Sequence, residues 1–195
     1  KLLEGQGKTD MPVTTRSEEA RAFFNQGISQ LHSFWATEAE RSFLQAATLD
    51  PDMAMAHWGI SVSAAGDHRA SFQNRRAREA AAAVKEEKIA RTDNGAAIDG
   101  QIRAREAIAK AMALRDKVTP RERLYIEAEA ARRNPASKDT DADYIAGMRK
   151  LVAAHPDDLE AKSFLGLALL YGYELPSEQP RPLTLEGVRL LEEII

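Results

Sequence analysis

The chain has no cysteine, and this absence excludes several kinds of chemistry at once. Disulfide bonds, zinc sites built on thiolates and cysteine nucleophiles all require that residue. A chain without cysteine fits a reducing or an oxidising compartment equally well, because it neither forms disulfides nor needs protection from them. The absence of cysteine therefore excludes these kinds of chemistry but does not indicate the compartment in which the protein resides.

Long apolar runs are also missing, since no stretch reaches the roughly 18 apolar residues that a membrane-spanning helix needs. The net charge is only −3, and residues of both signs are interspersed along the 195 positions. Nucleic acid and anionic membrane surfaces usually bind to a strongly basic face. The composition therefore predicts neither a nucleic-acid partner nor a membrane span.

Alanine and charged residues are abundant, whereas there are only 11 glycines and 8 prolines, a composition that favours helices. Ser17, followed by two glutamates, is typical of a helix start, and Thr119-Pro120-Arg121-Glu122 can form a capping box. Asp50-Pro51 closes one helix and opens the next, with the aspartate as its cap and the proline in its first turn. Apolar spacing predicts helices from 17 to a break at 33–36, from there to 50, and at about 52–65, 102–117, 119–133, 141–154, 157–171 and from 184 onward.

Two stretches of the chain, 39–56 and 144–161, resemble each other. Each is a helix that closes on a proline and is followed by a helix with an alanine five residues further on. The two prolines, Pro51 and Pro156, are 105 residues apart (156 − 51), which is close to three periods of roughly 34. This spacing indicates an array of helical hairpins.

The residues within the first stretch resemble the tetratricopeptide repeat (TPR) family. Phe23 and Gly27 match the large and small positions of the repeat's first helix. The small, aromatic, small and proline positions of its second helix are matched by Ala39, Phe43, Ala46 and Pro51. The resemblance implies an all-α fold of stacked antiparallel helical hairpins, a TPR-like α-solenoid with about 7–9 helices.

Three further segments are similar to a bacterial group of TPR proteins of unassigned function. They are Pro12-Val13-Thr14-Thr15, the stretch 50–59 (DPDMAMAHWG), and Thr119-Pro120-Arg121-Glu122-Arg123. Many members of that group are exported. The resemblance therefore implies a periplasmic or secreted location slightly more than a cytoplasmic one.

The domain organisation expected from these patterns is simple. Residues 1–16 are polar and aperiodic and should form an N-terminal loop, and 17–195 should form one TPR-like helical domain. Within that domain, 67–118 is expected to be a degenerate or inserted helical region, with a turn at Asp93-Asn94-Gly95. The last residues, 190–195, resemble a helix cut in mid-pattern, so we expect the C-terminal end to be truncated.

The motifs that would indicate chemistry are incomplete. Gly5-Gln6-Gly7-Lys8-Thr9 is similar to the end of a phosphate-binding loop, but Leu2 stands where such a loop needs its first glycine. No pair of histidines has the spacing of a helical metal site, and none has a glutamate three residues before it. We therefore predict no catalytic residue, no metal site and no cofactor. The four histidines are His32, His57, His68 and His155.

His57 and Trp58 are adjacent, and adjacent side chains on a helix point about 100° apart. Both therefore cannot face the same groove. We expect Trp58 to be buried in the core, and the other residue to face the concave side or the next helix.

The leading functional hypothesis is a scaffold that binds a protein or peptide partner on its concave surface, without catalysis. The candidate groove residues are taken from the first helices of the hairpins, off the packing face, together with the histidine next to Trp58. They are Asn25, Gln26, Ser29, His57, Ser61 and Lys162.

Two alternatives remain open. The first is an all-α enzyme or metal-dependent domain whose site is completed by residues beyond the fragment. It predicts a polar pocket near His57 or His32 with strongly shifted pKa values. The second is a structural subunit of an assembly.

Overall fold

The computed structural model describes residues 1–5, 9–67, 69–71, 91–174 and 177–195. Within these ranges the chain is all-helical apart from two short strands, which confirms the predicted fold class. The eight α-helices of the described ranges also agree with the expected 7–9. They are α1 (Glu18–His32), α2 (Ala36–Leu49), α3 (Ala54–Ala65), α5 (Arg91–Leu114), α6 (Pro120–Arg132), α7 (Thr140–Ala154), α8 (Leu159–Leu169) and α9 (Pro182–Glu192).

The remaining elements are small. A 3-10 turn, η2 (Arg115–Lys117), follows α5, and strands β1 (Tyr173–Glu174) and β2 (Gln179–Pro180) pair antiparallel between α8 and α9. Among the described helices, none combines the length and the apolar character that crossing a membrane requires.

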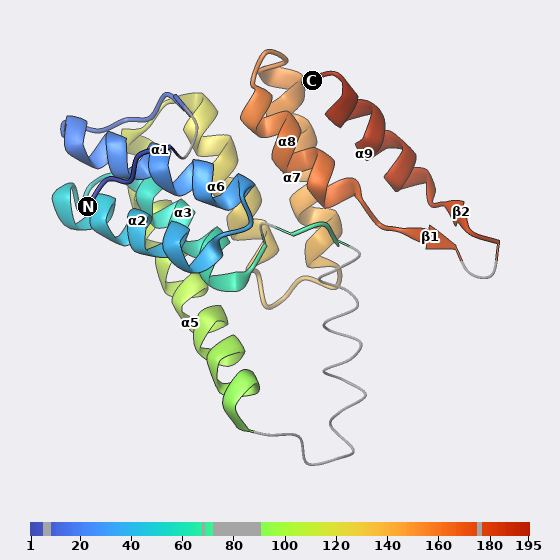
Figure 1. Cartoon of the computed structure of the whole chain (residues 1–195), viewed down its shortest axis with the longest axis horizontal. Helices are drawn as coiled ribbons and strands as arrows, with labels where there is room; N and C mark the ends of the chain where they lie inside the picture. Colours follow the sequence, from blue (N-terminus) through green and yellow to red (C-terminus); the bar gives the residue numbers. More distant parts are fainter. Residues whose placement is uncertain (6–8, 68, 72–90, 175–176) are drawn as a thin grey trace.

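Many consecutive helices of the described ranges pack against each other. In this way α1 packs on α2, α2 on α3, α6 on α7, α7 on α8 and α8 on α9, while α5 packs mainly on α3. Figure 1 shows the result, with α1, α2 and α3 at one end of the molecule and α7, α8 and α9 at the other. This packing is consistent with a helical-repeat arrangement.

The ring of Phe43 on α2 packs against Gly27 of α1 and Gly59 of α3. A Cβ atom added to Gly27 would stand 2.6 Å from Phe43 Cε1, and one added to Gly59 would stand 2.5 Å from Phe43 Cδ1. Both distances are too short for a side chain, so only glycine fits on either side of this fully buried ring. The pattern of small and aromatic residues in the sequence is thus explained by packing across three helices.

Two of the predicted helix starts are confirmed atom by atom. The Ser17 side chain accepts the N–H of Ala20 at 3.1 Å. At α6, Thr119 accepts the N–H of Glu122 at 3.2 Å, and the Glu122 carboxylate accepts the N–H of Thr119 at 3.0 Å. Both halves of the predicted capping box are therefore formed.

The third helix lies close to the predicted range of about 52–65, but its predicted cap, Asp50 with Pro51 in the first turn, is wrong. Helix α3 begins at Ala54, its N-cap is Met53, and no side chain caps it. The Asp50 carboxylate instead accepts the Thr15 hydroxyl at 2.6 Å and the Asp52 N–H at 3.2 Å. The Asp50 carboxylate, which the local sequence pattern predicted to cap the helix, therefore hydrogen-bonds the distant N-terminal segment instead.

Helix α5 lies in the region 67–118, of which residues 68 and 72–90 fall outside the described ranges. The turn expected at Asp93-Asn94-Gly95 is wrong, because α5 runs through it. Once the C-terminal part of a helix is fixed by packing, each further residue adds a backbone hydrogen bond. That packing is close, since a Cβ on Gly100 would stand 2.4 Å from the Ala64 carbonyl oxygen of α3.

Candidate functional site

The N-terminal segment, residues 9–16, has no regular secondary structure but is fixed to the helices by its backbone. The Met11 N–H donates to Asn25 Oδ1 at 3.2 Å, and the Thr14 N–H donates to Glu122 Oε1 at 2.6 Å. Its side chains alternate in the manner of an extended chain, with Met11 and Val13 buried in the core and Pro12 exposed. The helices thus hold this segment through both its backbone and alternate side chains.

Three of the predicted groove residues lie together beneath this N-terminal part of the chain. Asn25 accepts the Met11 N–H, Gln26 accepts the Leu3 N–H at 2.6 Å, and Ser29 pairs with the Thr9 hydroxyl at 2.8 Å. Gln26 also donates to the Ser42 hydroxyl at 2.9 Å. The polar groups that we expected to contact a partner are therefore engaged by the protein's own residues.

The other three predicted residues lie elsewhere. Ser61 is fully buried, so its expected place off the packing face is wrong. The same holds for Ser29, described above, which is also buried. His57 is also buried and donates from Nε2 to the Pro51 carbonyl at 2.9 Å. Lys162 pairs with Glu193 at 3.0 Å at the α8–α9 end. The six residues do not share one open surface.

Trp58 is buried, as predicted, with only 1% of its surface exposed. Its ring packs edge-on against Tyr125 and Phe164, with centroids 5.4 and 5.5 Å away. His57 is buried as well, so of the two positions expected for it, the concave side or the next helix, an open concave side is excluded. The reason is that α3 is the central helix, and all residues from Ala54 to Ser63 are buried. Its sequence carried that signal, because a helix without charges on any face is an enclosed one.

A buried charged cluster joins the C-terminal end of α3 to α6 and α7. The Ser61 hydroxyl donates to Glu129 Oε1 at 2.7 Å, and Arg133 Nε donates to the same oxygen at 2.9 Å. Arg133 also pairs with Asp67, and Arg132 bridges Asp67 and Asp141 at 3.7 and 3.6 Å. Glu129 is 0% exposed, so this cluster lies within the core.

Burial dominates the ionisation of this cluster. It raises the pKa of Glu129 to about 7, against the attraction of Arg132 and the hydrogen bond from Ser61. It also lowers the pKa of Arg133 to about 10 and raises the pKa of Tyr144, whose ring lies 4.3 Å from the Arg132 guanidinium carbon. A shifted carboxyl of this kind was expected of an enzyme, but near His57 or His32 and in a pocket.

Sequence reasoning missed Glu129, although a signal was present. Glu122, Tyr125, Ile126 and Glu129 follow the spacing of a single buried helix face, and acids on such a face must find partners in the core. Both acids are 0% exposed and accept hydrogen bonds from groups far away in the sequence or at the helix end, although Glu129 Oε2 is buried without a hydrogen-bond partner. They hold the fold together.

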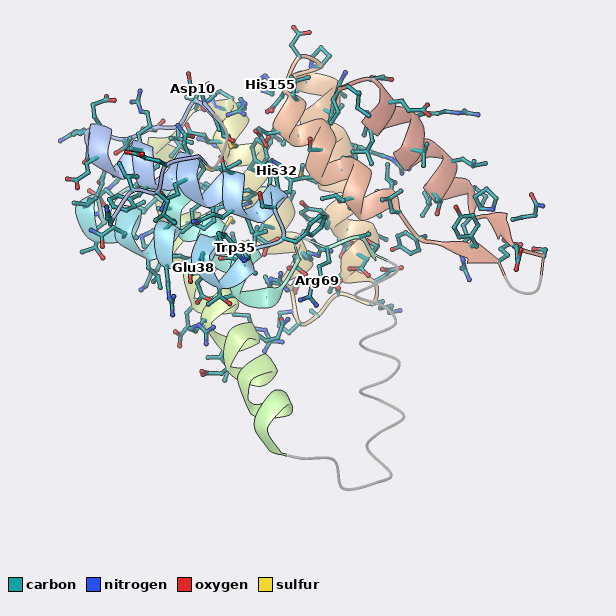
Figure 2. All side chains as sticks on the ribbon, viewed as in Figure 1. Asp10, His32, Trp35, Glu38, Arg69 and His155 are labelled. Carbon is teal, nitrogen blue, oxygen red and sulfur yellow. The ribbon has the colours of Figure 1, made fainter. Side chains whose placement is uncertain are left out.

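His32 is the last residue of α1, and His155 lies in the turn between α7 and α8 (Figure 2). His32 Nε2 is 2.5 Å from Glu160 Oε2 of α8. Nearby, a cavity of about 590 Å³ separates residues 9–12 from the turn 154–160. Among the residues that the structure describes, no group of three or more histidines, aspartates or glutamates is arranged to hold a metal ion. His68 and residues 6–8 of the glycine-containing motif lie outside the described residues.

A second cavity, of about 700 Å³, runs between α5 and α6, and we call it the α5–α6 groove. Its walls are two helical stripes with the same spacing of three, four and seven residues. One stripe consists of Arg105, Ile108, Ala109 and Met112, and the other of Glu127, Ala130, Ala131 and Asn134, with Arg115, Arg133 and Pro135 completing the lining. Unlike the face beneath the N-terminal segment, this groove is open.

Comparison with known proteins assigns neither a family nor a function to this chain. The chain matches no protein-family model, no curated protein and no solved structure. Its function has to be argued from its own residues and their geometry.

Proposed function

We propose that this protein is a TPR-like helical-repeat scaffold that binds a protein or peptide partner and has no catalytic activity of its own. The observation that supports this most strongly is the way in which the helices hold residues 9–16. Side chains of α1 and α6 hydrogen-bond the backbone of an extended segment, which is the chemistry that peptide recognition needs.

The two kinds of contact have separate roles in recognition. Backbone hydrogen bonds, such as those of Asn25 and Glu122, give affinity for any extended chain. Burial of alternate side chains, here Met11 and Val13, gives preference for a particular sequence. Arg121 adds a third contact by donating to the Pro12 carbonyl at 3.0 Å. Helical hairpins with this ability can hold a partner segment as well as their own.

The stacking of hairpins also supports a binding role. Arrays in which each hairpin packs mainly on its neighbours expose long continuous surfaces relative to their mass. In this chain such a surface includes the α5–α6 groove, which is hollowed and lined by apolar and basic side chains.

Panning a displayed random-peptide library against the immobilised full chain tests this proposal. We expect enrichment of related peptides that bind the free protein with one-to-one stoichiometry. An unrelated helical protein of similar charge, panned in parallel, controls for peptides that bind helices non-specifically. Failure to enrich any peptide, together with turnover of a small molecule by the purified chain, would contradict the proposal.

A further inference from the structure

The α5–α6 groove combines an apolar floor with cationic ends. Ile108 is almost fully buried at its base, Met112 is half-buried, and Ala109 and Ala130 leave room above them. Small side chains on two facing helices let a third segment approach closely. The apolar floor of the groove does not indicate which class of partner binds there, but its charged residues do.

Arg105 and Arg115 lie in the lining of this groove, and within the described part of the chain neither has an ion-pair partner. This contrasts with Arg103 on the same helix, which pairs with Glu40 at 2.8 Å. The third arginine of the groove, Arg133, is neutralised by its pairs with Asp67 and Glu129. Glu127 is the single acid among the lining residues, so the groove carries a net positive charge.

The two arginines also define a length. They are ten residues apart, and at a rise of about 1.5 Å per residue their backbones are separated by about 15 Å along α5 and η2. An extended chain advances about 3.3 Å per residue and spans that distance in four to five residues. Two carboxylates at that spacing would each reach one guanidinium.

We propose that the α5–α6 groove binds an acidic peptide segment of a partner protein. Two carboxylates, four or five residues apart, pair with Arg105 and Arg115, and the apolar side chains between them contact Ala109 and Met112. Guanidinium and carboxylate groups form paired hydrogen bonds, which is why arginine suits this role better than lysine. This inference rests on the proposed function and names the partner class.

Fluorescence anisotropy with the full chain and a labelled eight-residue peptide tests the inference. The peptide has glutamates at positions 2 and 6 with leucines between them, and a matched peptide has glutamines instead. We expect the glutamate peptide to bind at least tenfold more tightly, and its affinity to fall as salt is raised. Arg105→Glu and Arg115→Glu should each weaken binding at least tenfold.

Lys110→Glu provides the matched control, because Lys110 is an exposed cation on the same helix but outside the groove lining. It should change the affinity less than twofold. Equal binding of the two peptides, or equal losses in all three variants, would overturn the inference. So would a chain that dimerises in solution through Arg105, since the groove would then bind a second copy. If these peptides fail while library peptides still bind, only this inference falls and the proposed function stands.

Discussion

The ring of Phe43 fills the space that a side chain on Gly27 would need, 2.6 Å from the position of a Cβ atom. Gly27→Ala should therefore lower the free energy of unfolding by about 1–3 kcal/mol, the usual range for overpacking a core. Urea unfolding followed by circular dichroism measures it. In the double variant Gly27→Ala/Phe43→Leu the two losses should not add, because the smaller side chain makes room. Strict additivity would show that the ring and the glycine do not compete for space.

Met11 anchors the N-terminal segment, with 1% of its surface exposed. Met11→Ala should lower the free energy of unfolding by about 2–5 kcal/mol, as for other large-to-small core changes. Pro12→Ala is the matched control, because Pro12 is exposed and only its backbone carbonyl, which the variant keeps, contacts Arg121. Equal effects of the two substitutions in urea unfolding would mean that the segment is not part of the core.

Glu129 makes stability depend on pH, since burial raises its pKa from 4.5 to about 7. Below pH 4.5 both the folded and the unfolded state bind the proton, and between pH 4.5 and 7 only the folded state keeps it. Stability attributable to Glu129 therefore falls as the pH rises through this window and is constant above it. At about 1.4 kcal/mol per pKa unit, the loss is about 3 kcal/mol.

Urea unfolding of the wild type and of Glu129→Gln, across pH 4 to 8, measures this dependence. The difference in unfolding free energy between the two should change by about 3 kcal/mol in favour of the variant as the pH rises from 4.5 to 7. Glu127→Gln, an exposed acid on the same helix, should follow the wild type throughout. Parallel curves for wild type and Glu129→Gln would show that Glu129 titrates normally.

The two tryptophans differ in exposure, at 1% for Trp58 and 57% for Trp35. In the variant Trp35→Phe the remaining emission should therefore be blue-shifted and resistant to quenching by iodide. In Trp58→Phe, emission should resemble that of a tryptophan in water and be readily quenched. The indole N–H of Trp58 has no hydrogen-bond partner, so its replacement by phenylalanine leaves no polar group unpaired. A readily quenched Trp35→Phe variant would contradict the burial of Trp58.

Local chemistry made much of the fold predictable. The caps at Ser17 and Thr119 depend on atoms within three residues of each other, so their sequence signatures are sufficient. The all-helical class follows from composition and apolar spacing, and Trp58 was expected in the core because it and the adjacent His57 cannot face the same groove. The sequence pattern placed Gly27 on a small position and Phe43 on an aromatic position of the repeat, and the structure shows that this ring contacts glycines of two helices.

Long-range contacts account for what the sequence alone did not predict. Asp50 was expected to cap a helix but bonds Thr15, 35 residues away. Ser61 was expected in a groove but bonds Glu129, 68 residues away. Asn25 was expected to meet a partner and instead accepts the backbone of the chain's own N-terminal segment. In each case the residue type indicated that the side chain makes a polar contact, but the sequence did not indicate with which residue. Pairing at such separations is decided by the packing of whole helices.

Calorimetric titration of the enriched library peptide into the full chain, repeated with Arg105→Glu/Arg115→Glu and with Lys110→Glu, is the most direct test of a scaffold that binds acidic peptides. We predict one-to-one binding by the wild type and by Lys110→Glu, and at least tenfold weaker binding by the double arginine variant. Binding that is equal in all three proteins would contradict a role for the α5–α6 groove. The absence of binding in all three would contradict the scaffold itself.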